Sequence, residues 1–349
     1  MLKLSERLYA GMAERGIVGD IADLIFMKMS AFASYGFPES HSVSFAYLVY
    51  SSAWIKLHEP AVFCASLLNA QPMGFWAPHS LVQDAKRHGV VVRSVDINAS
   101  RADATLETCG ESTGGLSVRL GIGSVRGLSS AVAREIETHR PFANMEDLVR
   151  KVPQLHIGQL EALATAGAFN ESFGQQRRDA LWSAGAVIQS RPDRLQGVTT
   201  GAASPQLPGM QPLDEMIADL WATGVASSGH PTEFLRAELA RMGVATATEL
   251  PDCGARGDDK VLVAGTVTHR QRPATAQGVT FIGLEDETGL INVVCSPGCW
   301  IRYRVAARGA GALLVRGRLE VGDGGVINVV AEHIAPLSVG AKVAARNFR

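Results

Sequence analysis

Glycines, serines and arginines between residues 119 and 136, in the stretch RLGIGSVRGLSSAVAREI, have the types and spacing that bind an anion. Gly121, Gly123 and Gly127 allow the main chain to turn sharply or to approach another group closely. A helix begins directly after the turn, and the first N–H groups of a helix have no partner within it. Such a turn offers N–H groups and the helix dipole to one phosphate. The candidate phosphate contacts are Arg126, Gly127, Leu128, Ser129, Ser130 and Arg134.

The same glycines do not predict a dinucleotide site. That fingerprint needs a second strand with an acidic residue after the helix, whereas the segment that follows here, PFANMEDLVRKV at residues 141–152, has a helical pattern. A helix-hairpin-helix element remains, with RGLS at residues 126–129 as its hairpin. A glycine turn between packed helices also occurs without any ligand, and the sequence leaves that alternative open.

A second candidate surface for nucleic acid lies between residues 268 and 304. The segment THRQRPATAQG, residues 268–278, places Arg270 and Arg272 on an expected loop, where paired arginines have no packing role. Proteins that bind single strands combine a basic track with aromatic stacking platforms. Phe281 and Trp300 are candidate platforms, although both could instead fill the interior of a barrel. The predicted contacts are Arg270, Arg272, Phe281, Arg302 and Arg304.

The chain contains no familiar catalytic or metal-binding motif. It has no D-x-D, G-x-S-x-G, H-E-x-x-H or P-loop pattern. The three consecutive acids Glu285, Asp286 and Glu287 fall at an expected hairpin turn, where we expect them to be solvated. The five cysteines lack zinc spacing and are expected to be free thiols in a reducing compartment. We therefore predict neither a catalytic residue nor a metal or other cofactor in this chain.

Composition points to a cytoplasmic globular protein of several domains. The 349 residues are 46% hydrophobic and 19% charged, with a net charge of −1, so no global basic field attracts nucleic acid. Neither a signal peptide nor an apolar run of membrane-spanning length is expected. Any phosphate binding must therefore come from a local arrangement of residues.

The pattern along the chain predicts a multidomain α+β protein. Residues 1–100 are expected to be a helical segment, and the apolar stretch at residues 41–70 predicts a buried helix. Residues 101–180 are expected to form a short strand connector and a tandem helix-hairpin-helix module, and residues 181–256 a linker and helical connector. Residues 257–340 show three strands, a helix and two strands, which is the order of a five-stranded OB-fold β-barrel.

Three stretches resemble bacterial C-family DNA polymerases, the DNA polymerase III alpha subunit family. YGFPESHSVSFAYLVYSSAWIKLHEPAVFCASLLNA, residues 35–70, resembles the C-terminal part of their fingers, and VDIN followed by LGIGSVRGLS resembles their passage into the helix-hairpin-helix module. The segment from Val261 to Arg304 resembles the OB-fold of the error-prone, translesion branch. The resemblance covers essentially the whole chain in the family's own domain order.

The resemblance implies roles for particular residues. Ser40, His41 and Ser42 would lie near the incoming nucleotide and template, residues 127–130 would grip duplex phosphates, and the OB-fold would hold single-stranded template. The hairpin departs from the family's Gly-hydrophobic-Gly pattern because Ser129 replaces the second glycine. QLPGM, residues 206–210, lies where replicative members carry a sliding-clamp peptide, but it lacks the final aromatic residue. The resemblance thus implies a link to the clamp through a Y-family-like accessory protein.

The expected function is that of a DNA-binding part of an error-prone polymerase. The resemblance places the catalytic carboxylates, and the Mg²⁺ they hold, in a palm domain that these residues do not include, so we expect no polymerase activity from this chain alone. It would position primer-template and single-stranded DNA during repair and damage-induced synthesis. Two alternatives are a protein-interaction module and a truncated remnant of the polymerase. A steep dependence of DNA affinity on salt would favour the DNA-binding function over both alternatives.

Overall fold

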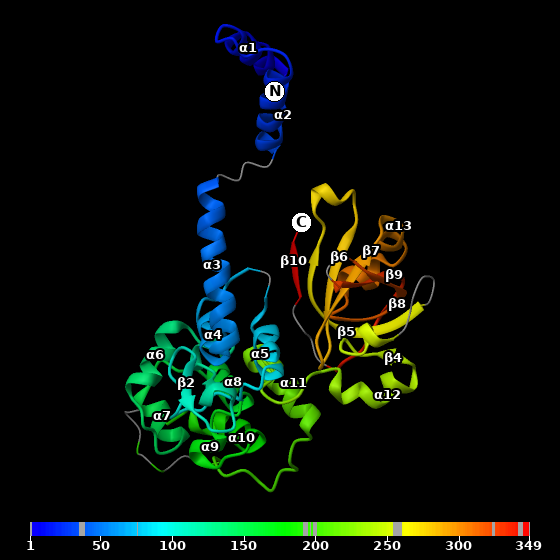
Figure 1. Ribbon diagram of the computed structural model, residues 1–349. Coiled ribbons are helices and arrows are strands. Elements are labelled where there is room, and N and C mark those ends of the chain that lie inside the picture. Colours follow the sequence, from blue (N-terminus) through cyan, green and yellow to red (C-terminus); the bar gives the residue numbers. More distant parts are fainter. Residues whose placement is uncertain are drawn as a thin grey trace. The chain divides into compact units, whose positions relative to one another are not determined.

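The computed structural model describes residues 2–34, 39–74, 76–190, 195, 197, 201–253, 260–322, 325–340 and 345–348 (Figure 1). They form two compact units, residues 1–57 and residues 58–349. The first unit contains α1 (Leu2–Ala13), α2 (Asp20–Ser34) and nearly all of α3 (Glu39–His58). The Tyr9 hydroxyl donates to Asp23 at 2.8 Å and its ring packs 5.3 Å from that of Phe26, which joins α1 to α2.

The apolar helix at residues 41–58 differs from expectation. We predicted a buried helix, but Val43 is 70% exposed, and Tyr47 and Tyr50 are each 72% exposed. Apolar residues on all sides of a helix predict burial only when a neighbouring element covers them, and these three side chains are exposed. The prediction is correct for α4 (Pro60–Asn69), which begins with proline at its first position. Ala61 and Cys64 on α4 are 2% and 3% exposed.

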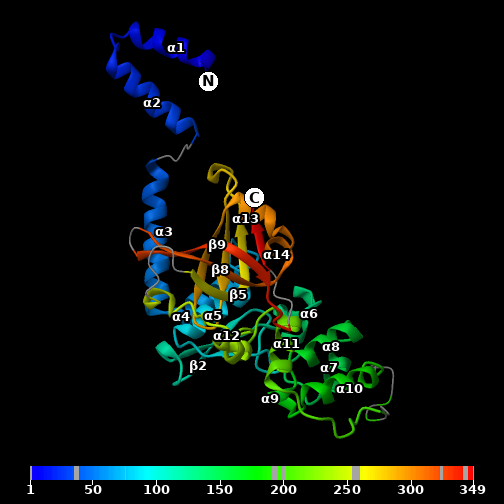
Figure 2. The ribbon, with the colours of Figure 1, turned by 90° about the vertical axis from the view of Figure 1, so that its right-hand side faces the viewer.

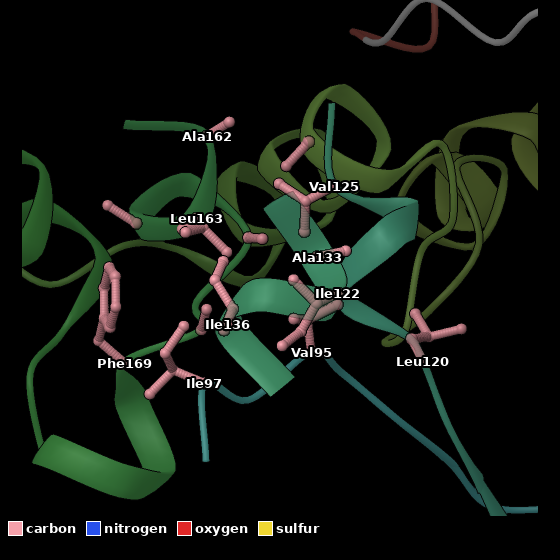
Figure 3. Close-up of a cluster of buried hydrophobic side chains, with 14 of the residues drawn as sticks. Val95, Ile97, Leu120, Ile122, Val125, Ala133, Ile136, Ala162, Leu163 and Phe169 are labelled. Carbon is pink, nitrogen blue, oxygen red and sulfur yellow. The ribbon is translucent and has the colours of Figure 1, made fainter. Parts of the chain in front are cut away.

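A helical layer and a small sheet make up the first part of the second unit. After α5 (Pro78–Arg87), the strands β1 (Val92–Arg93), β2 (Thr105–Thr108) and β3 (Leu116–Arg119) pair in the order β1-β3-β2. The helices that follow are α6 (Ser130–Thr138), α7 (Met145–Lys151), α8 (Ile157–Thr165), α9 (Asn170–Phe173) and α10 (Arg177–Val187). Their apolar faces and the chain beside the sheet form one core, in which Ile97, Ile122 and Phe169 are fully buried (Figure 3).

The connector is more helical at its ends than the predicted linker. Helix α10 extends to Val187, and α11 (Pro212–Thr223) begins at a proline. The turn η3 (Glu233–Leu235), α12 (Arg236–Arg241), β4 (Val244–Ala245) and η4 (Leu250–Asp252) then lead to the last domain. Among the described residues, no helix combines the length and the apolar character that crossing a membrane requires.

Five strands of the last domain pair in a ring and close a barrel. Figures 1 and 2 show this domain from two directions. The strands are β5 (Lys260–Gln271), β6 (Thr280–Glu285), β7 (Leu290–Cys295), β8 (Ala312–Val321) and β9 (Ile327–Pro336). Antiparallel pairs join β5 to β6, β6 to β7, β9 to β8 and β8 to β5, and a parallel pair joins β7 to β9. The short strand β4 and the last strand β10 (Arg346–Phe348) both pair with β5. The predicted OB-fold order is confirmed.

The helix predicted between the third and fourth barrel strands is two short helices. Helix α13 (Pro297–Arg302) begins at Ser296, whose hydroxyl accepts from the Cys299 N–H at 3.3 Å, and α14 (Arg304–Gly309) follows directly. The break lies at Tyr303, whose ring packs 4.8 Å from that of His333 on β9. Trp300 is half-buried against the barrel core, so it fills the structural role that the sequence left open.

Candidate nucleic-acid interface

The hairpin at residues 125–130 has the geometry predicted from its glycine and serines. It connects the short turn η2 (Ile122–Ser124) to α6, and Gly127 adopts a left-handed φ of 79°. Ser129 caps α6 because its hydroxyl accepts from the Val132 N–H at 3.3 Å. A Cβ placed on Gly127 would meet no atom within 4 Å, so the turn faces open space. Another molecule can therefore approach the main chain at this turn.

The other two glycines of the motif serve the protein's own packing. A Cβ on Gly121 would lie 2.5 Å from the main-chain carbon of Asp103, and one on Gly123 would lie 2.9 Å from the Ala102 carbonyl oxygen. These positions need glycine because another stretch of the same chain passes against them. Gly127 alone combines a left-handed turn with an open side, so it is the glycine of the three that suits a ligand.

Two arginines lie beside the turn, and both are exposed. The Arg126 guanidinium lies 5.0 Å from the centre of the Trp221 ring on α11, a cation–π arrangement, and its main-chain N–H donates to Ala222 at 2.7 Å. Arg134 lies on α6 and, with Ser124 and Ser130, lines a cavity of about 350 Å³ next to the turn. Two exposed positive charges therefore lie near the turn.

The candidate contacts on the barrel divide into buried and exposed residues. We predicted that Arg270 lies on a loop. It lies instead within β5, where it is 7% exposed. Its Nε donates to the Ala307 carbonyl at 2.6 Å and its Nη2 to that of Ala310, so its guanidinium binds one carbonyl within α14 and one just after it. The premise that Arg270 has no packing role is wrong. Arg272, just after β5, is exposed.

Phe281, for which the sequence left core and surface positions open, lies on the outer face of β6 with 39% of its surface exposed. Its neighbours Thr280 and Ile282 are buried. Arg302 and Arg304, at the end of α13 and the start of α14, are also exposed. Arg272, Phe281, Arg302 and Arg304 are thus accessible to a ligand, and Arg270 is not.

The acidic turn differs most from expectation. Glu285 and Asp286 are 0% exposed, whereas we predicted solvated side chains. Glu285 accepts from Ser80 at 2.8 Å and pairs with Arg87 on α5 at 2.9 Å. Burial raises the pKa of Glu285, and the Arg87 charge opposes that rise. The turn therefore anchors the barrel to α5.

The two neighbours of Glu285 extend this anchor. Asp286 accepts from the Ala247 N–H at 2.8 Å and also binds the main chain of its own turn. Glu287 pairs with Arg236 on α12 and accepts from the Thr232 hydroxyl at 2.6 Å. Three consecutive acids thus bind residues from outside the barrel or close their own turn, which is why they are not solvated.

Two buried histidines lie close to this anchor. The rings of His79 on α5 and His230 stack with their centres 5.5 Å apart, and the residues are 4% and 1% exposed. Burial, aided by Lys86 and Arg87, lowers the pKa of His79 to about 4. Burial and the neighbouring His79 lower the pKa of His230 to about 2. Both rings are therefore neutral at physiological pH.

The residues implied near an incoming nucleotide lie on α3 in the first unit. His41 and Ser42 are exposed, and the side chain of Ser40 is outside the described residues. The five cysteines are free thiols, of which Cys253 alone is exposed. Within the described part of the chain, no group of three or more His, Cys, Asp or Glu side chains is placed to hold a metal ion.

Comparison with known proteins gives two domain families. A helix-hairpin-helix motif family matches residues 89–180, and an OB-fold nucleic acid binding domain family matches residues 261–337. Among solved structures, asparaginyl-tRNA synthetase from Pyrococcus horikoshii aligns with 29% of this chain and 24% of its own, at 17% identity and a TM-score of 0.24.

Curated relatives match the whole chain. The error-prone DNA polymerase of Nocardia farcinica is 53% identical over 361 residues, an alignment that covers 100% of this chain and 31% of that protein. The error-prone DNA polymerase of Mycobacterium tuberculosis is 52% identical over 355 residues, with 100% and 31% covered. The chain therefore spans about a third of the length of the curated relatives it matches.

Proposed function

Because the chain is homologous over its full length to the C-terminal third of bacterial error-prone DNA polymerases, we propose that it is the DNA-holding part of such an enzyme. The helix-hairpin-helix module holds duplex phosphates through the turn at Gly127. The barrel holds single-stranded template. Both act in DNA repair and damage-induced synthesis.

One observation carries this proposal. The turn at Gly127 is open on the side where a Cβ would stand, and the two arginines beside it are exposed. Main-chain N–H groups at the start of a helix bind phosphate without reading base sequence. A polymerase must hold DNA of any sequence, and this kind of contact suits that requirement.

The homology also supports roles for residues outside this turn. We place Ser40, His41 and Ser42 near the incoming nucleotide, and Arg272, Phe281, Arg302 and Arg304 on the template strand. The proposal assigns no step of nucleotidyl transfer to these residues. Catalysis belongs to the part of the relatives' length that this chain does not span.

A Y-family-like accessory protein is the proposed link to the sliding clamp. The segment at residues 206–210 lacks the final aromatic residue of a clamp-binding peptide. Its Pro208 carbonyl accepts from Arg178 on α10 at 2.9 Å, so part of this segment is tied to the chain itself. Both features favour indirect attachment to the clamp.

A protein-binding role for α3 is a second candidate, and the exposed apolar surface described above favours it. Val43, Tyr47, Val49, Tyr50 and Leu57 are each at least 65% exposed. Exposed apolar patches of this kind mark contacts with other protein surfaces. In this proposal α3 contacts the remaining part of the polymerase or a partner.

Fluorescence anisotropy with labelled single-stranded, duplex and primer-template DNA across a salt series tests the main proposal. Phosphate binding predicts that log affinity falls linearly with log salt, with a slope set by the number of phosphates neutralised. Arg126→Ala should reduce duplex affinity and flatten the slope, and Arg241→Ala, at an exposed position at the end of α12, is the control. No binding at low salt would favour the protein-binding role instead.

A further inference from the structure

The outer face of the barrel where β5 pairs with β6 is covered unequally by the rest of the chain. Three cross-strand pairs form this face: Thr266 with Glu285, His269 with Gly283, and Gln271 with Phe281. They follow one another from the middle of β5 to the loop that carries Arg272. The three pairs differ in which part of the chain packs over them, and this difference determines where a ligand can bind.

Helix α5 covers the first pair. Glu285 is fully buried because Ser80 and Arg87, both on α5, bind its carboxylate. Thr266 opposite is 1% exposed. A strand of DNA that lies on this face therefore ends before Glu285.

The second pair carries one aromatic ring, that of His269, and a ring from outside the barrel lies against it. A Cβ on Gly283 would lie 2.5 Å from His269 Cε1, so the missing side chain allows the imidazole to lie across β6. The ring of Trp76, from the loop between α4 and α5, meets the His269 ring edge to face, with centres 5.6 Å apart. Trp76 is half-buried and retains accessible surface. Trp76 is far from the barrel strands in the sequence, but its ring contacts a residue of β5.

The third pair is open to solvent. Phe281 is 39% exposed, and its neighbour across the strand on β7, Val294, is half-buried. Residues that lie diagonally across two antiparallel strands are about 7–8 Å apart, which places Phe281 next to His269. Arg272, exposed just beyond β5, adds a positive charge at this end of the face.

We propose that Trp76 and Phe281 form one row of stacking surfaces for the bases of single-stranded DNA, with His269 packed beside them, and that α5 sets the end of this row. The proposal rests on the proposed DNA-binding function and adds to it a residue that the helical part of the chain supplies. Stacking on aromatic rings accepts any base, because every base has a π face. Arg272 binds backbone phosphate at the open end.

Equilibrium binding of the 349-residue chain to a short labelled oligothymidylate tests the row. Trp76→Leu and Phe281→Leu should each lower the affinity roughly tenfold, the scale of one lost base–aromatic contact. Neither should change the slope of log affinity against log salt, since no phosphate contact is removed. Trp182→Leu is the matched control, because Trp182 is 54% exposed on α10, away from this face.

Two further measurements separate stacking from loss of structure. Trp76→Phe and Phe281→Tyr keep an aromatic face and should retain affinity close to that of the unchanged chain. An oligonucleotide of the same length with abasic positions should bind weakly and should not discriminate between the unchanged chain and the two leucine variants. Circular dichroism confirms that each variant is folded.

The outcomes distinguish this proposal from the proposed function. If the chain binds oligothymidylate with the expected salt slope and both leucine variants bind equally well, the stacking row is wrong and DNA binding stands. If the leucine variants and the aromatic replacements lose affinity alike, the role of these positions is structural and the row is again wrong. If the unchanged chain binds no single strand at low salt, the stacking row and the proposed role of the barrel both fail, and only the duplex contact at Gly127 stands.

Discussion

The side-chain amide of Gln159 on α8 donates a hydrogen bond to the main-chain carbonyl of Gly127 at 2.9 Å. Its oxygen accepts from the His156 N–H at 3.2 Å, so this one side chain joins the hairpin before α6 to the hairpin before α8. Gln159 is 5% exposed. The position of the open turn thus depends on a residue from the second hairpin of the tandem module.

Replacing Gln159 with leucine should destabilise the chain. The change leaves the Gly127 carbonyl and the His156 N–H without this partner, and we expect the free energy of unfolding to fall by about 1–3 kcal/mol. Urea unfolding measures the loss. Gln154→Leu, an exposed glutamine between α7 and α8, is the control and should change the free energy by less than about 0.5 kcal/mol. Equal losses in the two variants would contradict this account.

Alanine at Gly127 should separate DNA binding from stability. The left-handed φ of 79° makes alanine unfavourable by about 1 kcal/mol, but the added Cβ meets no protein atom. The methyl group stands on the open side of the turn, so duplex affinity should fall severalfold in an anisotropy titration. Gly174→Ala is the matched control, because Gly174 has a φ of 65° and equally open surroundings. If both variants keep full duplex affinity, the turn does not contact DNA.

The two arginines at the end of β5 should behave oppositely. Arg270→Ala removes a buried guanidinium that binds two carbonyls, so we expect the barrel to lose about 2–4 kcal/mol of stability. Arg272→Ala should leave the melting temperature unchanged and reduce the affinity and salt slope for single-stranded DNA. Thermal unfolding and anisotropy on both variants provide the measurements. A stable Arg270→Ala variant with weak DNA binding would restore the original prediction for Arg270.

The contrast between these arginines shows how far a strand pattern predicts a fold. The alternation of Val261, Val263 and Val267 correctly predicts β5 and its inward face. The register shifts between Val267 and His269, and the shift turns Arg270 to the inside, opposite Ile282. A bulge changes which face each later residue occupies, and residue type alone does not reveal it.

Long-range contacts explain the other differences. The sequence around Glu285 predicts a solvated turn because it contains no sign of Arg87, which lies 198 residues earlier. Gln159 and Trp76 were missed for the same reason, since each acts on a residue from a distant segment. Local patterns predicted the elements and the turn at Gly127, whereas these contacts depend on how the elements pack.

Breaking the ion pair between Arg87 and Glu285 should be costly. Arg87→Met leaves a fully buried carboxylate without its charged partner, and we expect a loss of about 3–5 kcal/mol, measured by urea unfolding. Arg87→Met combined with Glu285→Met should recover a large part of this loss. The pair Lys260–Glu332 is the surface control, and Glu332→Gln should cost less than about 1 kcal/mol. Similar losses for Arg87→Met and Glu332→Gln would show that the anchor at Glu285 does not hold the barrel.

The neutral pair His79 and His230 predicts that stability falls in mild acid. Burial lowers both folded-state pKa values well below the ordinary value of 6.5, to about 4 for His79. Between pH 6.5 and pH 4 the unfolded chain therefore binds more protons than the folded chain, and stability is lost as the pH falls through this window. Each histidine contributes a slope of up to about 1.4 kcal/mol per pH unit. Lys86, Arg87 and Arg236 reinforce the effect because they repel a charged ring.

Unfolding free energies at several pH values between 7 and 4.5 measure this slope, and His230→Asn isolates the contribution of one ring. Glu285 acts in the opposite direction, because its raised pKa adds stability as the pH falls. Glu285 is present in both the unchanged chain and the His230→Asn variant, so its contribution cancels to first order when the pH slopes of these two chains are compared. His230→Asn should have the shallower slope, and His139→Asn, at the exposed end of α6, should keep that of the unchanged chain. Identical slopes in all three chains would show that the buried rings do not resist protonation.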